Sequence, residues 1–106
     1  MKRGDLVIVA VSGDYGKPRP ALVVQADSFD AHTSVTLLPL TSEIHDAPLL
    51  RVNVAAGKES GLRAPSQIMV DKATTVPRSK VGQRIGRVNS ATMQSVNVAL
   101  RDFLGL

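Results

Sequence analysis

The chain has 106 residues, with 13 Lys and Arg against 9 Asp and Glu and a formal net charge of +4 at pH 7. A hydrophobic fraction of 43% with 21% charged residues is typical of one small folded domain, expected to span residues 1–106. The sequence has no cysteine and two histidines, which argues against disulfides, thiol nucleophiles and a Cys- or His-rich metal site. Three aromatic residues are too few for a platform of rings that stacks on bases.

Apolar runs in this sequence are short. None approaches the roughly 18 residues expected of a membrane-spanning helix. The apolar stretch 6–11 that follows the basic start of the chain is shorter than the core of a normal signal peptide. We therefore expect a soluble cytoplasmic protein without a membrane partner.

In the first half of the chain, aliphatic and β-branched runs alternate with clusters of turn-forming residues. Pro18 and Pro20 hold Arg19 in extended backbone, because proline fixes its own φ and disfavours helical geometry in the residue before it. Pro39 lacks the N–H that sheet pairing uses, which predicts an edge strand or a bulge. The pattern predicts three strands, over residues 6–11, 21–25 and 34–40.

The second half begins with the same pattern and ends with a different one. Short strands are predicted over residues 50–54, 66–70 and 84–88, with residues 72–80 as a polar connection. From Ser90, the predicted N-cap, apolar residues recur at helical spacing until Gly105, where a helix is expected to stop. The predicted fold class is mainly β with a C-terminal helix, as a small, strongly curved sheet or barrel.

Several short motifs stand in a characteristic order along nearly the whole chain. They are RGDLV at 3–7, RPALVV at 19–24, PLTS at 39–42, Gly61 and Leu62 followed by Ser66 and Asp71, and Ile85 with Gly86. The ordered set resembles the MazF/PemK family of toxins. This resemblance implies an SH3-like barrel of the CcdB/PemK type, a homodimer, and a metal-independent endoribonuclease without a cofactor. It also implies single-stranded mRNA as substrate and a cognate antitoxin whose flexible, acidic tail covers the active groove.

Arg19 and Thr41 match the two residues that the family ties to cleavage. A guanidinium stays charged at neutral pH and presents a planar fork of donors to phosphate, so we assign Arg19 to charge stabilisation rather than to proton donation. Thr41 can donate a hydrogen bond to a phosphate oxygen. Asp14 is the candidate general base, although the ordinary pKa of Asp, about 3.9, makes a weak base unless loop closure raises it. His32 and His45 have a better pKa but lie outside the family motifs.

The remaining candidates are predicted to bind substrate, and the first loop, shorter here than in relatives, leaves the recognition sequence open. These candidates are Lys17, Ser42, Tyr15, Asp71 and Lys72, with Tyr15 as the one aromatic ring near the proposed site. Met69 is apolar where some relatives have arginine. Between Lys72 and Arg87 there are five basic residues and no acidic one, which fits either a solvated face or a contact to the phosphate backbone.

Two other functions fit the same pattern. A CcdB-like toxin would poison DNA gyrase by binding it, but such toxins depend on a C-terminal aromatic residue, whereas this chain ends in Leu104, Gly105 and Leu106. A barrel that binds RNA or an antitoxin without cleaving RNA is the other alternative. Considered singly, Arg19, Thr41 and Asp14 also fit an ordinary surface arginine and ordinary turn residues.

Overall fold

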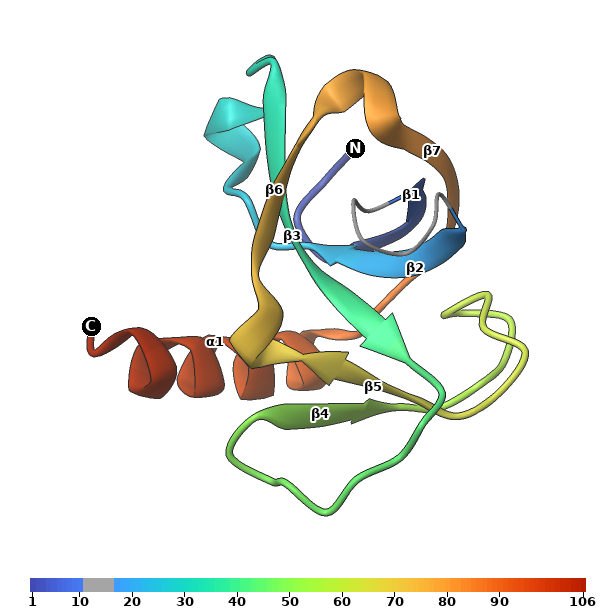
Figure 1. Cartoon of the computed structure of the whole chain (residues 1–106), viewed down its shortest axis with the longest axis vertical. Helices are drawn as coiled ribbons and strands as arrows, with labels where there is room; N and C mark the ends of the chain where they lie inside the picture. The colour runs from blue at the N-terminus through green and yellow to red at the C-terminus, as the bar shows by residue number, and fades with distance from the viewer. Residues whose placement is uncertain (11–16) are drawn as a thin grey trace.

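The computed structural model describes residues 1–10 and 17–106, which form a strongly curved antiparallel sheet and one long helix (Figure 1). The strands are β1 (Asp5–Ala10), β2 (Pro18–Val23), β3 (Ser34–Thr41), β4 (Arg51–Val54), β5 (Ser66–Met69), β6 (Thr74–Pro77) and β7 (Val81–Arg87). Three short 3-10 helices connect them: η1 (Asp27–Phe29), η2 (Val70–Lys72) and η3 (Arg78–Lys80). The helix α1 (Ser90–Leu104) ends the chain.

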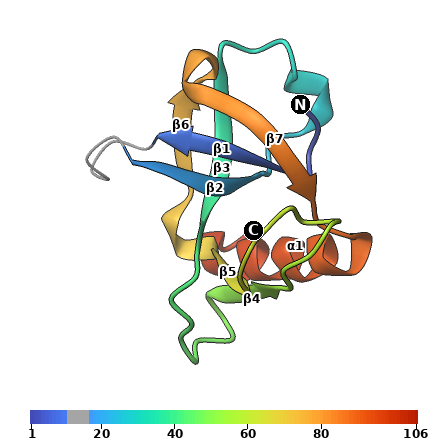
Figure 2. The ribbon, with the colours of Figure 1, turned by 90° about the vertical axis from the view of Figure 1, so that its right-hand side faces the viewer.

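The strand order is β4-β5-β3-β2-β1-β7, and β6 also pairs with β3. The long strand β3 therefore has β2 on one side, and β6 followed by β5 on the other. Figures 1 and 2 show β1, β2, β3, β6 and β7 curving around one another, with β4, β5 and α1 beneath them. Within the described residues no pairing joins β4 to β7, so the sheet is curved but not closed, and the name barrel applies only loosely.

The structure corrects two expectations about strands. Residues 72–80 are not only a polar connection, because Thr74 to Pro77 form β6 and pair with β3 from Ser34 to Leu37. The alternation of small polar and apolar residues there is too short to predict a strand without its partner. Pro39 does not mark an edge, since β3 is paired on both sides. It lies between Leu37, the last residue paired with β6, and Leu40, the first paired with β5, where no N–H is needed on that side.

Two clusters of apolar side chains form the core, one on each face of the curved sheet. The first lies between the sheet and α1 and includes Leu22, Leu38 and Ile68 together with Val96 and Ala99 of the helix. The second lies inside the curve formed by β1, β2, β3 and β6. Neighbouring residues of β1, β2 and β3 enter opposite clusters, as the pleat of a β-strand requires.

The helix α1 begins and ends with specific capping contacts. Asn89, and not Ser90 as predicted, is the N-cap, because its side-chain oxygen accepts a hydrogen bond from the Thr92 N–H at 2.8 Å. Gly105 ends the helix in left-handed backbone with φ of 71°. The helix buries Val96 and Ala99, whereas Phe103 and Leu104 at its end are exposed. No helix in the described part of the chain is both long and apolar enough to cross a membrane.

A partly buried ion pair joins the start of β1 to β7. Asp5 Oδ1 lies 3.0 Å from Arg84 Nε, and the Asp5 side chain is 11% exposed. Burial raises the pKa of Asp5, but hydrogen bonds from the Lys2 N–H and from Arg84, together with nearby positive charge, outweigh it and hold the pKa below its ordinary value of 3.8. The folded state therefore favours the charged carboxylate.

This lowered pKa makes stability depend on pH in a defined direction. The contribution of Asp5 is fully present above the pKa of the unfolded chain, about 3.9, and is lost as pH falls through the folded-state pKa. Asp5→Asn is expected to lower the free energy of unfolding by about 1 kcal/mol at pH 7. The two proteins should converge at strongly acidic pH, below the folded-state pKa of Asp5, where the wild-type carboxyl is also neutral. Urea unfolding at both pH values measures this, and an equal difference at both would contradict the assignment.

Candidate functional site

Arg19 and Thr41 lie at the same end of two neighbouring strands. In the β2–β3 pair, Ala21 is opposite Pro39 and Val23 is opposite Leu37. Continuing this register by two residues sets Arg19 opposite Thr41. Opposite residues of an antiparallel pair point to the same face, and here it is the face of Ala21, Val23 and Leu37 in the second core cluster.

Both residues lie where this face of the sheet passes from the core to the protein surface. Arg19 is exposed, and Thr41 is half-buried at the end of β3. The Thr41 hydroxyl oxygen accepts a hydrogen bond from the Glu43 N–H at 3.1 Å. Because that bond uses a lone pair of the oxygen, the hydroxyl proton is available for donation to another acceptor. A guanidinium beside a hydroxyl donor is an arrangement suited to a phosphate group.

The first loop of the predicted site is described only in part. Lys17 is exposed and directly precedes β2, which places it two residues from Arg19. Ser42 is exposed and directly follows Thr41. Asp14 and Tyr15, the candidate base and the candidate stacking ring, lie outside the described residues. The described part of the site therefore consists of Lys17, Arg19, Thr41 and Ser42.

Asp71 and Lys72 are not brought to this end of the sheet. They belong to η2, between β5 and β6, beside the middle of β3. Asp71 Oδ2 lies 4.0 Å from Lys72 Nζ. The other carboxylate oxygen, Oδ1, is the one buried side-chain polar atom without a hydrogen-bond partner among the residues that the structure describes.

Comparisons with known proteins identify the family of this chain. The family model of PemK-like, MazF-like toxins of type II toxin–antitoxin systems matches residues 2–104. The chain belongs to the PemK/MazF toxin family. It is 47% identical, over 100% of its length and 98% of the relative's, to a probable endoribonuclease MazF of Mycolicibacterium smegmatis (strain ATCC 700084 / mc(2)155).

Solved structures of the PemK/MazF family share the fold. The Mycobacterium tuberculosis toxin MazF-mt6 superposes with a TM-score of 0.83 at 25% identity, covering 96% of this chain and 97% of that one. A mycobacterial endoribonuclease in complex with its cognate antitoxin gives a TM-score of 0.81 at 26% identity, covering 100% of this chain and 96% of that one. These likenesses favour the endoribonuclease class over the CcdB-like alternative.

Gln67 was not among the site residues predicted from the sequence. It pairs with Thr41 across β3 and β5. Its side chain is hydrogen-bonded to the backbone of His45, in the connection that follows Thr41. A single Gln in a predicted strand does not by itself indicate that its side chain holds a neighbouring segment of the chain. The ring of His45 lies 3.4 Å from the Glu43 carboxylate, whereas the His32 carbonyl accepts a hydrogen bond from Arg78 at 2.7 Å.

The basic run from Lys72 to Arg87 does not form one free cationic track in this toxin. Its members are spread over η2, η3 and β7. Arg78 is engaged with the His32 carbonyl, and Arg84 with Asp5. Lys72 lies beside Asp71, so at least three of the five cations make contacts within the fold. In the described residues no group of three or more His, Cys, Asp or Glu side chains could hold a metal ion.

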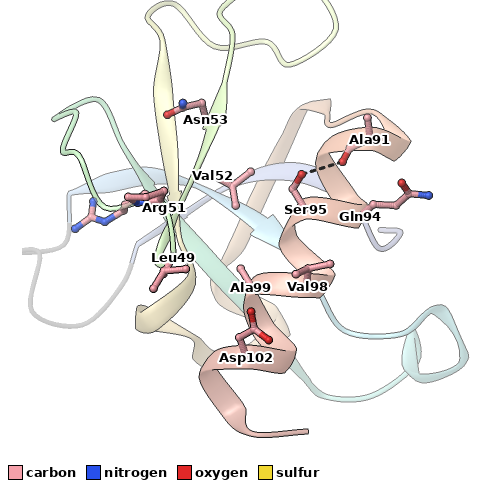
Figure 3. Close-up of a pocket in the computed structure, with 11 residues that line it drawn as sticks. Leu49, Arg51, Val52, Asn53, Ala91, Gln94, Ser95, Val98, Ala99 and Asp102 are labelled. Carbon is pink, nitrogen blue, oxygen red and sulfur yellow. Dashed lines mark hydrogen bonds between the residues drawn. The ribbon is translucent and has the colours of Figure 1, made fainter.

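A groove of about 510 Å³ lies between β4 and α1, where Leu49 and Val52 face Val98 and Ala99 (Figure 3). Leu49 is 76% exposed and Val98 is 61% exposed. Arg51 and Asp102 are the charged residues that line it, and none of the candidate site residues does. The groove is therefore separate from the surface that carries Arg19 and Thr41.

Proposed function

We propose that this chain, taken as one domain over residues 1–106, is the toxin of a type II toxin–antitoxin pair and cleaves single-stranded mRNA at specific sequences without a metal. The observation that carries the proposal is the β2–β3 register, which pairs Ala21 with Pro39. If it continues by two residues, Arg19 stands opposite Thr41 at an exposed end of the sheet. Membership of the PemK/MazF family supports the class of reaction.

The proposed reaction is a transesterification within the RNA. The 2′-hydroxyl oxygen attacks the adjacent phosphorus, and the bond from phosphorus to the 5′ oxygen breaks. The products are a 2′,3′-cyclic phosphate and a 5′-hydroxyl. A base takes the proton of the 2′-hydroxyl, and a proton reaches the leaving oxygen. Negative charge grows on the non-bridging phosphate oxygens, and donors aimed at that charge lower the barrier.

Each candidate residue has a role in this proposal. Arg19 holds the non-bridging oxygens with two donors of its guanidinium, and Thr41 donates its hydroxyl proton to the same phosphate. Asp14 is the proposed base. Lys17, Ser42 and Tyr15 bind the neighbouring nucleotides. Asp71 and Lys72 form a second RNA contact at η2.

The proposed partners follow from charge and from the relatives. A net charge of +4 favours an acidic partner, and the relative solved with its cognate antitoxin makes an antitoxin with an acidic, flexible tail the natural candidate. We also propose that the toxin works as a homodimer in the cytoplasm.

The cleavage test is direct. Purified protein with a long RNA in excess EDTA is expected to cut at defined sequences as fast as without EDTA, because Arg19 and Thr41 supply what a metal would otherwise supply. Sequencing of the 5′ ends and mass analysis of the 3′ ends should give 5′-hydroxyls and 2′,3′-cyclic phosphates. Loss of cutting in EDTA, or 3′-hydroxyl products, would contradict the proposal. A shift in RNA mobility without new ends would favour the non-cleaving barrel.

A further inference from the structure

Gln67 is a buried polar side chain at the centre of a row that crosses three strands. It is the register partner of Thr41 on β3 and of Asn53 on β4. The residue is 4% exposed, although glutamine is usually found at protein surfaces. A buried amide is costly unless its donors and acceptor are satisfied, so its partners indicate what it stabilises.

The Gln67 amide clamps a single peptide segment from both sides. Its Oε1 accepts a hydrogen bond from the His45 N–H at 3.0 Å, and its Nε2 donates to the His45 carbonyl at 2.9 Å. The second Nε2 donor bonds to Asn53 Oδ1 at 3.0 Å. His45 lies in the connection of residues 42–50, which has no regular secondary structure from 42 to 47. The clamp therefore replaces the ladder bonds that would otherwise order this segment.

The clamped segment leads directly back to Thr41. The Glu43 N–H, two residues before His45, donates to Thr41 Oγ1 at 3.1 Å. That bond leaves the hydroxyl proton directed away from Glu43. The position of the Glu43 amide depends on where the chain is held at its two ends, which are Thr41 in β3 and His45 against Gln67.

We propose that Gln67 is a positioning residue for RNA cleavage: it holds His45, and through the short segment back to Glu43 it aims the Thr41 hydroxyl at the scissile phosphate. The inference rests on the proposed function and adds to it a residue that does not touch RNA. A misaligned donor stabilises the charge that develops in the transition state less well, whereas substrate binding in the ground state changes little. Loss of the clamp therefore lowers kcat with little change in KM.

The test is a double-mutant cycle between Gln67→Met and Thr41→Ala, with kcat and KM measured on one short RNA. Gln67→Met keeps the length and approximate volume of the side chain but removes the amide that bonds to His45. It is expected to lower kcat about 10-fold. Thr41→Ala should cost about 100-fold in the wild-type background but only about 10-fold in the Gln67→Met background, because the double mutant should be no slower than Thr41→Ala alone if Gln67 acts through the hydroxyl. Asn53→Ala is the matched control, since it removes a partner of the same amide without releasing His45, and it should retain wild-type kcat.

The outcomes separate the clamp from general stability and from the proposed function. Hydrogen exchange should show faster exchange at the Glu43 and His45 amides in Gln67→Met while the strand amides stay protected. Additive losses in the cycle, or an equal loss in Asn53→Ala, would overturn the proposal. If Gln67→Met does not fold, the same cycle is measured with Gln67→Glu. Glutamate keeps the acceptor for the His45 N–H but loses both donors. Absence of cleavage by the wild type would reject the proposed function itself.

Discussion

Arg19→Ala is expected to reduce kcat/KM for RNA cleavage about 10³-fold, because it removes the only guanidinium that we assign to the phosphate. Arg19 is exposed at the end of β2, so the substitution opens no cavity in the core. The thermal midpoint should change little. Initial rates on a defined single-stranded RNA in EDTA, together with a thermal melt, measure both expectations.

Arg19→Lys is the matched control for charge. Lysine keeps the positive charge but not the planar fork, so its rate should lie between those of the wild type and Arg19→Ala. RNA binding by Arg19→Lys should weaken more steeply with salt than binding by Arg19→Ala, because only the lysine variant keeps a cation at the phosphate. A lysine variant as slow as the alanine variant would indicate that donor geometry dominates, whereas full activity of Arg19→Ala would remove Arg19 from the site.

Gly86→Ala is expected to destabilise the fold by about 3 kcal/mol, because the backbone of another segment occupies the place of a side chain. A Cβ at Gly86 would lie 2.3 Å from the Ser60 carbonyl carbon and oxygen and 2.4 Å from the Glu59 carbonyl oxygen. The Arg87 N–H donates to that same Glu59 carbonyl at 2.9 Å, so the connection between β4 and β5 is held tightly against β7. The backbone would have to move for the methyl group to fit.

Thermal and urea unfolding measure this effect. For a domain of this size, 3 kcal/mol corresponds to a drop in Tm of roughly 12 to 24 °C. Gly82→Ala is the control on the same strand, because among the described residues its Cβ would meet only the Ile8 carbonyl oxygen, at 3.2 Å. It should cost no more than about 1 kcal/mol. Equal stability of the two variants would show that the contact at Gly86 can relax.

The sequence predicted six of the seven strands in the described part of the chain, because each of the six has an apolar or alternating pattern of its own. It missed β6, whose four residues are stabilised by pairing with β3 rather than by their own pattern. The helix was predicted from residue 90 onward, but the capping side chain belongs to Asn89. Its last apolar residues, Phe103 and Leu104, are exposed, because the helix extends beyond the sheet that covers Val96 and Ala99.

The sequence alone determined the class of the fold, the family and the types of residue at the site, because strand patterns and short ordered motifs are local properties of the chain. Only the tertiary structure decided which of these residues meet. The β2–β3 register pairs Ala21 with Pro39 and so directs Arg19 and Thr41 to the same end of the sheet. The helix η2 keeps Asp71 and Lys72 beside the middle of β3, and the β3–β5 pair sets Gln67 opposite Thr41. Register and strand order depend on long-range pairing, which no local pattern encodes.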